Sequence, residues 1–271
     1  MNYPAARAAA LLTLIGAVLT GSPAQATLPI DHDNLDSSRP LRFEDADAIA
    51  YRERAIEFGF APVAPNRRNG IGLGLSAEYL YGFALNSHFS VDFDPSLGAR
   101  SATPDRRFNA NNVGVGIFHN LNRETLSAPA LAVRLDTYLP TGRGAAGLGV
   151  RLRGILSRTF NQYSRVHVNL DLNAETSPED GTRSVLPAVT VGFSRPFGFP
   201  DRFDRTVIGE IGTRASEETG RGAVFYTGVG IRQQVTVRSV VDIGIQSEFA
   251  ATNGRASRDN LRLVAGYSTQ F

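Results

Sequence analysis

Acidic and arginine side chains recur at alternate positions in stretches whose other residues are apolar. In one stretch, Leu135 separates Arg134 from Asp136, and Val133 precedes Arg134. Successive side chains of a strand point to opposite faces, so this spacing gathers the charges on one face. Such charges could pair across strands, or line a pore and set its selectivity. The residues expected on this enclosed face are Glu57, Glu78, Asp92, Arg134, Asp136, Arg151, Arg153, Arg165, Asp171, Glu210, Arg232, Asp242 and Glu248.

A second pattern of chemical interest is His88-Phe89-Ser90, which places a base and a hydroxyl two residues apart on one strand face. A histidine in that position could activate the serine as a nucleophile. The pair resembles the His-x-Ser of outer-membrane phospholipase A and lipid A deacylase barrels, and Asn111 or Asn112 could complete the site. In those enzymes the pair faces lipid, whereas the alternation here directs His88 and Ser90 to the polar side. A lipid hydrolase is therefore the less favoured hypothesis.

The sequence shows no signature of a metal or phosphate-binding site. The other histidines have no metal-ligand spacing, and the many glycines alternate within strand-like stretches instead of opening a helix. We therefore expect no metal and no cofactor.

About twelve alternating stretches must position these side chains. Most are close to the nine to eleven or so residues that cross a bilayer as a tilted strand. Connections rich in Gly, Pro, Ser and Asp (94–111, 174–184, 214–222 and 250–259) alternate with shorter ones, such as a turn at Gly82-Phe83. The expected strands are 54–63, 70–81, 84–93, 112–120, 129–139, 147–160, 163–173, 185–195, 205–213, 223–234, 237–249 and 260–271.

The final stretch resembles the closing strand of bacterial outer-membrane β-barrels, in which the terminal Phe belongs to the signal read by the barrel-assembly machinery. Tyr267 and Phe271 share one face of this stretch and would form that membrane insertion signal. Aromatic residues near strand ends would form the girdles at the membrane interfaces. These are Tyr79, Tyr81, Tyr138, Phe249 and Tyr267.

The chain begins with a pattern typical of export. Residues 1–26 combine Arg7, a short apolar run and an Ala-x-Ala site ending at Ala26, which predicts a secretory signal peptide. Residues 27–53 are polar and acidic and predict a short periplasmic N-terminal segment. Residues 54–271 would then form the barrel. No later apolar run is long enough for a transmembrane helix, and the absence of cysteine excludes disulfides.

The charges argue against nucleic acid as a partner. Every basic side chain apart from histidine is arginine, acids are interspersed with them, and the formal net charge is only +2. A nucleic-acid footprint needs a concentrated basic face. Loop arginines could instead pair with the phosphates of lipopolysaccharide, so the expected partners are lipopolysaccharide, outer-membrane lipids, the assembly machinery and a small-molecule solute.

The run from Arg39 to Ala46, Arg-Pro-Leu-Arg-Phe-Glu-Asp-Ala, resembles the lead-in of the phenol-degradation meta-pathway family of outer-membrane transporters. Phe43 stands where that family suggests Thr. The resemblance implies a single antiparallel transmembrane β-barrel, of all-β class, in the outer membrane of a Gram-negative bacterium. It also implies a channel for a small solute, hydrophobic or aromatic. A structural barrel with a plugged lumen stays open as the alternative.

Overall fold

The structure is a computed structural model that describes residues 39–65, 71–98, 108–141, 147–161, 163–197, 204–252 and 255–271. Of residues 65, 251, 252 and 255–259 it describes the backbone alone. The predicted signal peptide at 1–26 and the first part of the predicted segment 27–53 lie outside the described residues.

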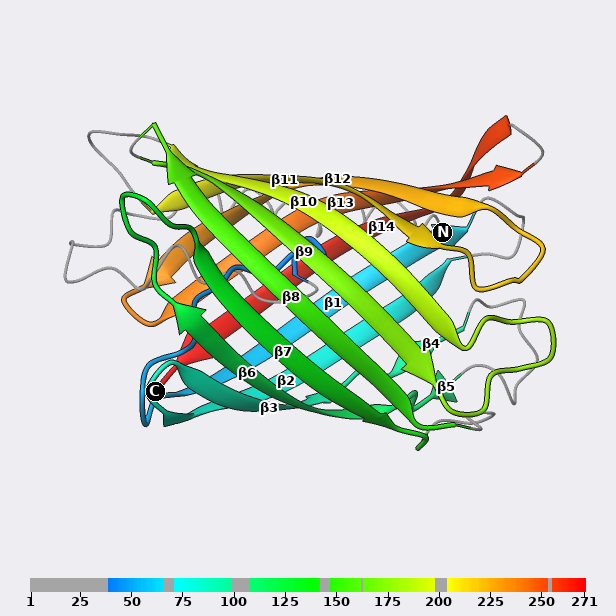
Figure 1. The fold of residues 1–271 in the computed structure, drawn as a ribbon, viewed down its shortest axis with the longest axis horizontal. Coiled ribbons are helices and arrows are strands. Elements are labelled where there is room, and N and C mark those ends of the chain that lie inside the picture. Colours follow the sequence, from blue (N-terminus) through cyan, green and yellow to red (C-terminus); the bar gives the residue numbers. More distant parts are fainter. Residues whose placement is uncertain are drawn as a thin grey trace, which may run out of the picture.

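Twelve long antiparallel strands form a closed barrel (Figure 1). Each strand pairs with its neighbour in the sequence, and the pairings β1–β2 and β1–β14 complete the ring. The predicted all-β barrel of about twelve strands is confirmed. The strands are β1 (Arg54–Pro65), β2 (Gly72–Ala84), β3 (Ser87–Phe93), β6 (Val113–Asn122), β7 (Ala130–Leu139), β8 (Gly149–Phe160), β9 (Ser164–Glu175), β10 (Val185–Phe197), β11 (Arg205–Ala215), β12 (Ala223–Thr236), β13 (Ser239–Thr252) and β14 (Arg255–Gln270).

Two short strands, β4 (Ser96–Leu97) and β5 (Phe108–Asn109), lie in the connection after β3 and were not predicted. β4 pairs with β2 at Leu73 and Gly74, beyond the end of β3, and β5 pairs with β4. Two-residue strands leave no periodicity in the sequence. The predicted connection 250–259 is also mostly strand, because β13 continues to Thr252 and β14 begins at Arg255.

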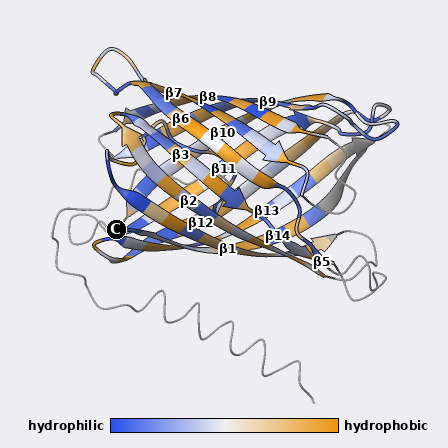
Figure 2. Ribbon diagram, turned by 90° about the horizontal axis from the view of Figure 1, so that it is seen from below, coloured by the Kyte–Doolittle hydropathy of each residue, from blue (hydrophilic) through white to orange (hydrophobic). Residues whose placement is uncertain are grey.

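Side chains alternate between the two faces of the barrel wall as the sequence pattern requires. In β7, the buried Ala132, Arg134 and Asp136 alternate with the exposed Val133 and Leu135. Hydrophobic and hydrophilic positions alternate along the strands in the same way (Figure 2). Closure pairs the strand edges, and the outer face carries the large apolar side chains, so the wall suits a lipid environment.

The turn between β2 and β3 differs from the predicted turn at Gly82-Phe83. β2 continues to Ala84, and the turn falls at Leu85 and Asn86, where Asn86 has a φ of 61°. At Gly82 the backbone of β2 instead lies close to the backbone of the N-terminal segment, and its N–H donates to the carbonyl of Glu53 at 3.0 Å. A side chain at Gly82 would overlap the carbonyl of Ala50.

Aromatic residues near the strand ends divide between the two faces. Tyr79 and Tyr81 pack their rings against Phe89 with centroids 6.3 and 5.6 Å apart. Tyr138 was expected in an interfacial girdle, but its side chain lines cavities inside the barrel. Its strand position shares the inner face with Arg134 and Asp136, and the sequence rule for girdles does not separate inner from outer aromatics.

The described part of the N-terminal segment lies inside the barrel instead of ahead of it (Figure 1). Leu41, Phe43 and Ala46 are at most 2% exposed. The segment leaves the barrel near the chain's C-terminal end, where Arg54 and Phe271 exchange backbone hydrogen bonds of 2.9 and 3.3 Å. Within the described part of the chain, no helix is long and apolar enough to cross a membrane.

Candidate functional site

Three acids stand side by side on the inner face of the wall. Glu57 on β1 pairs in register with Glu78 on β2, and Glu78 with Asp92 on β3. Like charges directly opposite each other destabilise a sheet. Arginines compensate two of these acids: Arg39 of the N-terminal segment pairs with Glu57, and Arg134 donates to Glu78 at 2.8 Å.

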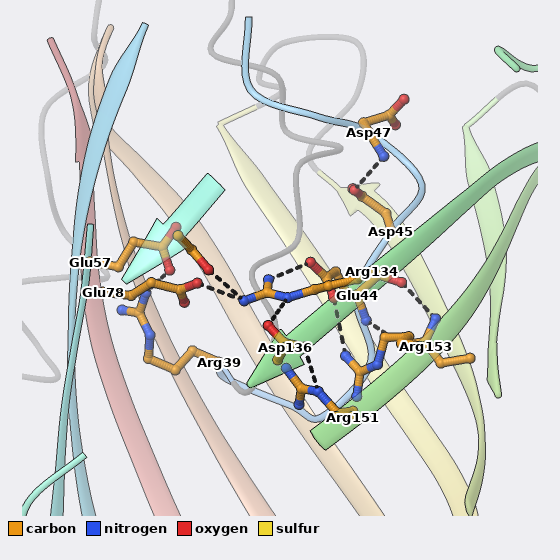
Figure 3. A network of polar contacts seen from close by, with 12 residues as sticks. Arg39, Glu44, Asp45, Asp47, Glu57, Glu78, Arg134, Asp136, Arg151 and Arg153 are labelled. Atoms are coloured by element: carbon orange, nitrogen blue, oxygen red, sulfur yellow. Dashed lines mark hydrogen bonds and ion pairs between the residues drawn. The ribbon is translucent and has the colours of Figure 1, made fainter. Parts of the chain in front are cut away.

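Arg134 is the centre of a larger polar network (Figure 3). Its side chain is 3% exposed, and its nitrogens also donate to Glu44 at 2.9 Å and to Asp136 at 2.8 Å. Asp136, fully buried, receives a second hydrogen bond of 2.9 Å from Arg151. Each of the three guanidinium nitrogens of Arg134 thus has a carboxylate partner, and together these partners hold the planar group in one orientation.

Arg153 lies on β8 directly opposite Arg134 on β7. Arg153 forms a two-point pair with Asp171, at 2.6 and 3.1 Å, and donates to Glu44 at 3.2 Å. Glu44 therefore bridges two facing arginines.

The remaining sequence-predicted residues also point inward. Arg165 pairs with Asp47 at 3.0 Å, and Arg232 lies 3.8 Å from Asp242. Glu248 pairs with Arg42. Glu210 accepts a hydrogen bond of 2.7 Å from the backbone N–H of Arg42.

The barrel wall also binds the backbone of the N-terminal segment at every second residue. Asn169 binds both backbone groups of Glu44, accepting from its N–H at 2.7 Å and donating to its carbonyl at 2.8 Å. Side chains of four further strands make the same kind of contact. These are Gln246 to the carbonyl of Pro40 at 2.9 Å, Glu210 to Arg42, Ser157 to the N–H of Ala46 at 3.0 Å, and Asn120 to the carbonyl of Ala46.

Glycines of the wall make room for the segment's apolar side chains. The ring of Phe43 covers Gly192 and stacks on His167 with centroids 5.1 Å apart. Leu41 lies against Gly228. Backbone polar groups and apolar side chains of the segment are thus both matched to the wall, so residues 39–47 form a fixed part of the interior.

The sequence analysis did not single out the uncharged polar side chains that hold this segment, among them Asn169, Ser157 and Asn120. His167 shares hydrogen bonds with Ser157 at 2.9 Å and Ser194 at 3.0 Å. Their inner-face positions follow from the alternation, but their partners lie on the segment or on neighbouring strands, which strand periodicity does not indicate.

His88 and Ser90 do not form a lipid-facing catalytic pair. His88 stacks on Phe118 with centroids 4.7 Å apart, and Ser90 accepts a hydrogen bond of 3.0 Å from Arg134. Their side chains are 3% and 1% exposed. Asn111 donates to the carbonyl of Asp94 instead. The arrangement gives the hydrolase hypothesis no support.

Two neighbouring cavities hollow the interior near the loop end of the strands. The inner cavity has a volume of about 60 Å³, and charged side chains such as Glu78, Asp92 and Arg151 line it. The outer cavity, of about 200 Å³, is bounded by residues such as Asn173 and Leu186. Tyr138 lines both cavities.

Asp94 lies at the edge of the inner cavity, in the connection after β3. Burial and the neighbouring charge of Glu78 raise the pKa of its carboxyl group above the ordinary value. Across the described ranges, no group of three or more His, Asp or Glu residues is arranged to hold a metal ion.

No protein-family model and no curated protein matches the sequence. Solved structures match the fold. An outer-membrane channel from Pseudomonas putida F1 aligns with a TM-score of 0.64 and 11% identity, covering 88% of this chain and all of that one. The NanC porin aligns with a TM-score of 0.57 and 8% identity, over 79% of this chain and 98% of its own. The CymD monoaromatic hydrocarbon channel aligns with a TM-score of 0.52 and 8% identity, over 82% and 89%. At this level of identity the likeness concerns the fold, and the chain has the fold of bacterial outer-membrane channels, as the sequence resemblance implied.

Proposed function

We propose that this protein is an outer-membrane channel for a small solute, with segment 39–47 narrowing its bore. The observation that carries the proposal is the pair of adjoining cavities inside a closed barrel whose inner wall is charged. A wall of fixed charges around a cavity is how pores select their solutes. The inner cavity of about 60 Å³ restricts passage to small molecules.

The solute class that we favour is small and aromatic. Tyr138 and Leu186 contribute apolar surface to the outer cavity, and Asn112 and Asn173 contribute hydrogen-bonding groups. Ligand sites commonly combine apolar walls with a few polar groups in this way. The CymD structure, described as a monoaromatic hydrocarbon channel, shares the barrel architecture. The charged inner cavity favours solutes that also carry a polar group.

One observation favours the alternative of a structural barrel with a plugged lumen. Segment 39–47 crosses the interior and forms ion pairs with several strands, through Arg39, Arg42, Glu44 and Asp47. A segment held this firmly could seal the barrel instead of narrowing it.

Planar-bilayer recording separates the two functions. We expect discrete conductance steps from the wild type, and larger steps when Leu41 and Phe43 are both changed to Ala, because both side chains fill the interior. The matched control is Leu135→Ala on the outer face, which should leave the step size unchanged. A silent wild type would contradict the channel and leave the sealed barrel.

We further propose that the protein is exported by residues 1–26 and inserted into the outer membrane by the assembly machinery, with lipopolysaccharide around its loop end. The arginine-containing connections and the apolar outer wall support this location. Density-gradient fractionation should place the protein with lipopolysaccharide, and N-terminal sequencing of that fraction should start at Thr27.

A further inference from the structure

The geometry points to Tyr138 as the residue that determines which solutes pass from the outer cavity to the inner one. The inference rests on the proposed channel function and adds the specificity-determining side chain to it. Among the described residues, Tyr138 lines both cavities, and each of the others lines only one of them. We therefore place its ring where the two cavities meet.

The wall has a glycine on either side of Tyr138. Its cross-strand neighbours are Gly114 on β6 and Gly149 on β8. A Cβ on Gly149 would lie 3.3 Å from the Cβ and 3.4 Å from a ring carbon of Tyr138. The ring thus occupies the space that a side chain on β8 would fill. The carboxylate of Asp92 covers Gly114 and the ring of Tyr138 covers Gly149, so on the β8 side the tyrosine is the side chain that lies between the cavities.

The ring is held from the side of the inner cavity. The guanidinium carbon of Arg151 lies 5.8 Å from the ring centroid, within the range of a cation–π contact. Arg151 is itself fixed by its 2.9 Å hydrogen bond to Asp136, which Arg134 also binds. The charged network therefore contacts the ring on the side of the inner cavity, and the outer cavity lies on the other side of the ring.

Removing the ring would join the two cavities. A solute in the outer cavity meets Asn112, Asn173 and Leu186, and beyond Tyr138 it meets Glu78, Asp92 and Arg151. Shortening the side chain at position 138 widens the opening between the outer cavity and the inner cavity. Truncation at Leu139, the next residue of β7, leaves both cavities unchanged, because Leu139 lies on the outer face and lines neither of them.

The test is proteoliposome swelling with a series of neutral sugars from a pentose to a trisaccharide. We expect Tyr138→Ala and Tyr138→Val to raise the rates for the larger sugars several-fold relative to the pentose. Tyr138→Phe, which keeps the ring, should behave as the wild type. Leu139→Ala, on the outer face of the same strand, is the matched control and should leave the ratio of large to small sugar unchanged. Folding of each variant is verified by the mobility shift between unheated and heated samples on an SDS gel.

The outcomes separate the inference from the function on which it rests. Swelling of wild-type vesicles with the pentose reports the channel itself, and its absence together with a silent planar bilayer would reject the proposed function. A conducting wild type with an unchanged sugar ratio in folded Tyr138→Ala and Tyr138→Val would overturn the role of Tyr138. An equal change of that ratio in Leu139→Ala would overturn it as well.

Discussion

Glu44 shows how a single residue settles the electrostatics of the interior. Arg134 and Arg153 face each other across β7 and β8, an arrangement that would cost stability if left uncompensated. The carboxylate of Glu44 reaches both, at 2.9 and 3.2 Å. The segment thus adds a carboxylate that binds both arginines, beside the acids of the wall that each arginine already binds.

Changing Glu44 to Gln should lower the free energy of unfolding by about 2 kcal/mol. The two arginines keep Glu78, Asp136 and Asp171 as partners, so the loss stays below the roughly 3–5 kcal/mol of a buried charge left alone. Urea unfolding in lipid vesicles measures it. The control is Asp47→Asn, whose side chain is 30% exposed and should cost about 0–1 kcal/mol. Equal losses of unfolding free energy in both variants would show that the contact of Glu44 with two arginines contributes no more to stability than the partly exposed pair of Asp47.

At the scale of elements, the segment 39–47 and the strands beneath it are matched by shape as well as by charge. Phe43 fits over Gly192 and stacks on His167, while Asn169 binds the backbone of the next residue, Glu44. Glycine at position 192 is needed because any side chain there would occupy the volume of the Phe43 ring. An extended segment can be held in this way without adding a strand to the sheet.

Gly192→Ala should displace Phe43, because the added methyl group overlaps its ring. We expect a loss of about 1–3 kcal/mol, as for other overpacked interiors, together with larger conductance steps as the segment loosens. Gly154→Ala is the matched control: a Cβ at Gly154 meets no atom within 4 Å, and its position on β8 is on the outer face. Its stability should stay within about 0.5 kcal/mol of the wild type. Unchanged conductance in a folded Gly192→Ala would mean that Phe43 does not restrict the bore.

At the scale of the whole molecule, the barrel is inverted relative to a soluble domain. Its outer wall exposes large apolar side chains such as Leu135, Leu170 and Ile211, at 49%, 56% and 64%. The described interior holds small apolar clusters and many buried ions. Such a molecule requires a bilayer or detergent around it, since water would face the apolar wall.

An arginine introduced into the outer wall should cost stability according to its depth. Leu135 lies in the middle of β7 and Leu139 at its end, and both are exposed. In lipid vesicles, Leu135→Arg should lose about 2–4 kcal/mol and Leu139→Arg about 0–1 kcal/mol, because a charge near the bilayer midplane is desolvated and one at the rim is not. Similar urea midpoints for both variants would mean that this face does not contact lipid.

The amino-acid sequence by itself determined the twelve long strands and the alternation of side chains along them, but not the two-residue strands β4 and β5. These follow from a period of two residues and from segment lengths, which are local properties that the chain shows directly. The inward direction of Arg134, Asp136 and Asp171 followed for the same reason.

The tertiary structure alone decided that residues 39–47 run inside the barrel and which groups meet there. Glu44 and Arg153 are far apart in the chain, and their contact depends on barrel closure and strand register, which no local pattern encodes. Likewise Tyr138 could be placed near a strand end from the sequence, but its position between two cavities exists only once six strands enclose a space. Local periodicity determines which residues form the strands of the wall, and barrel closure brings residues that are distant in the chain together inside it.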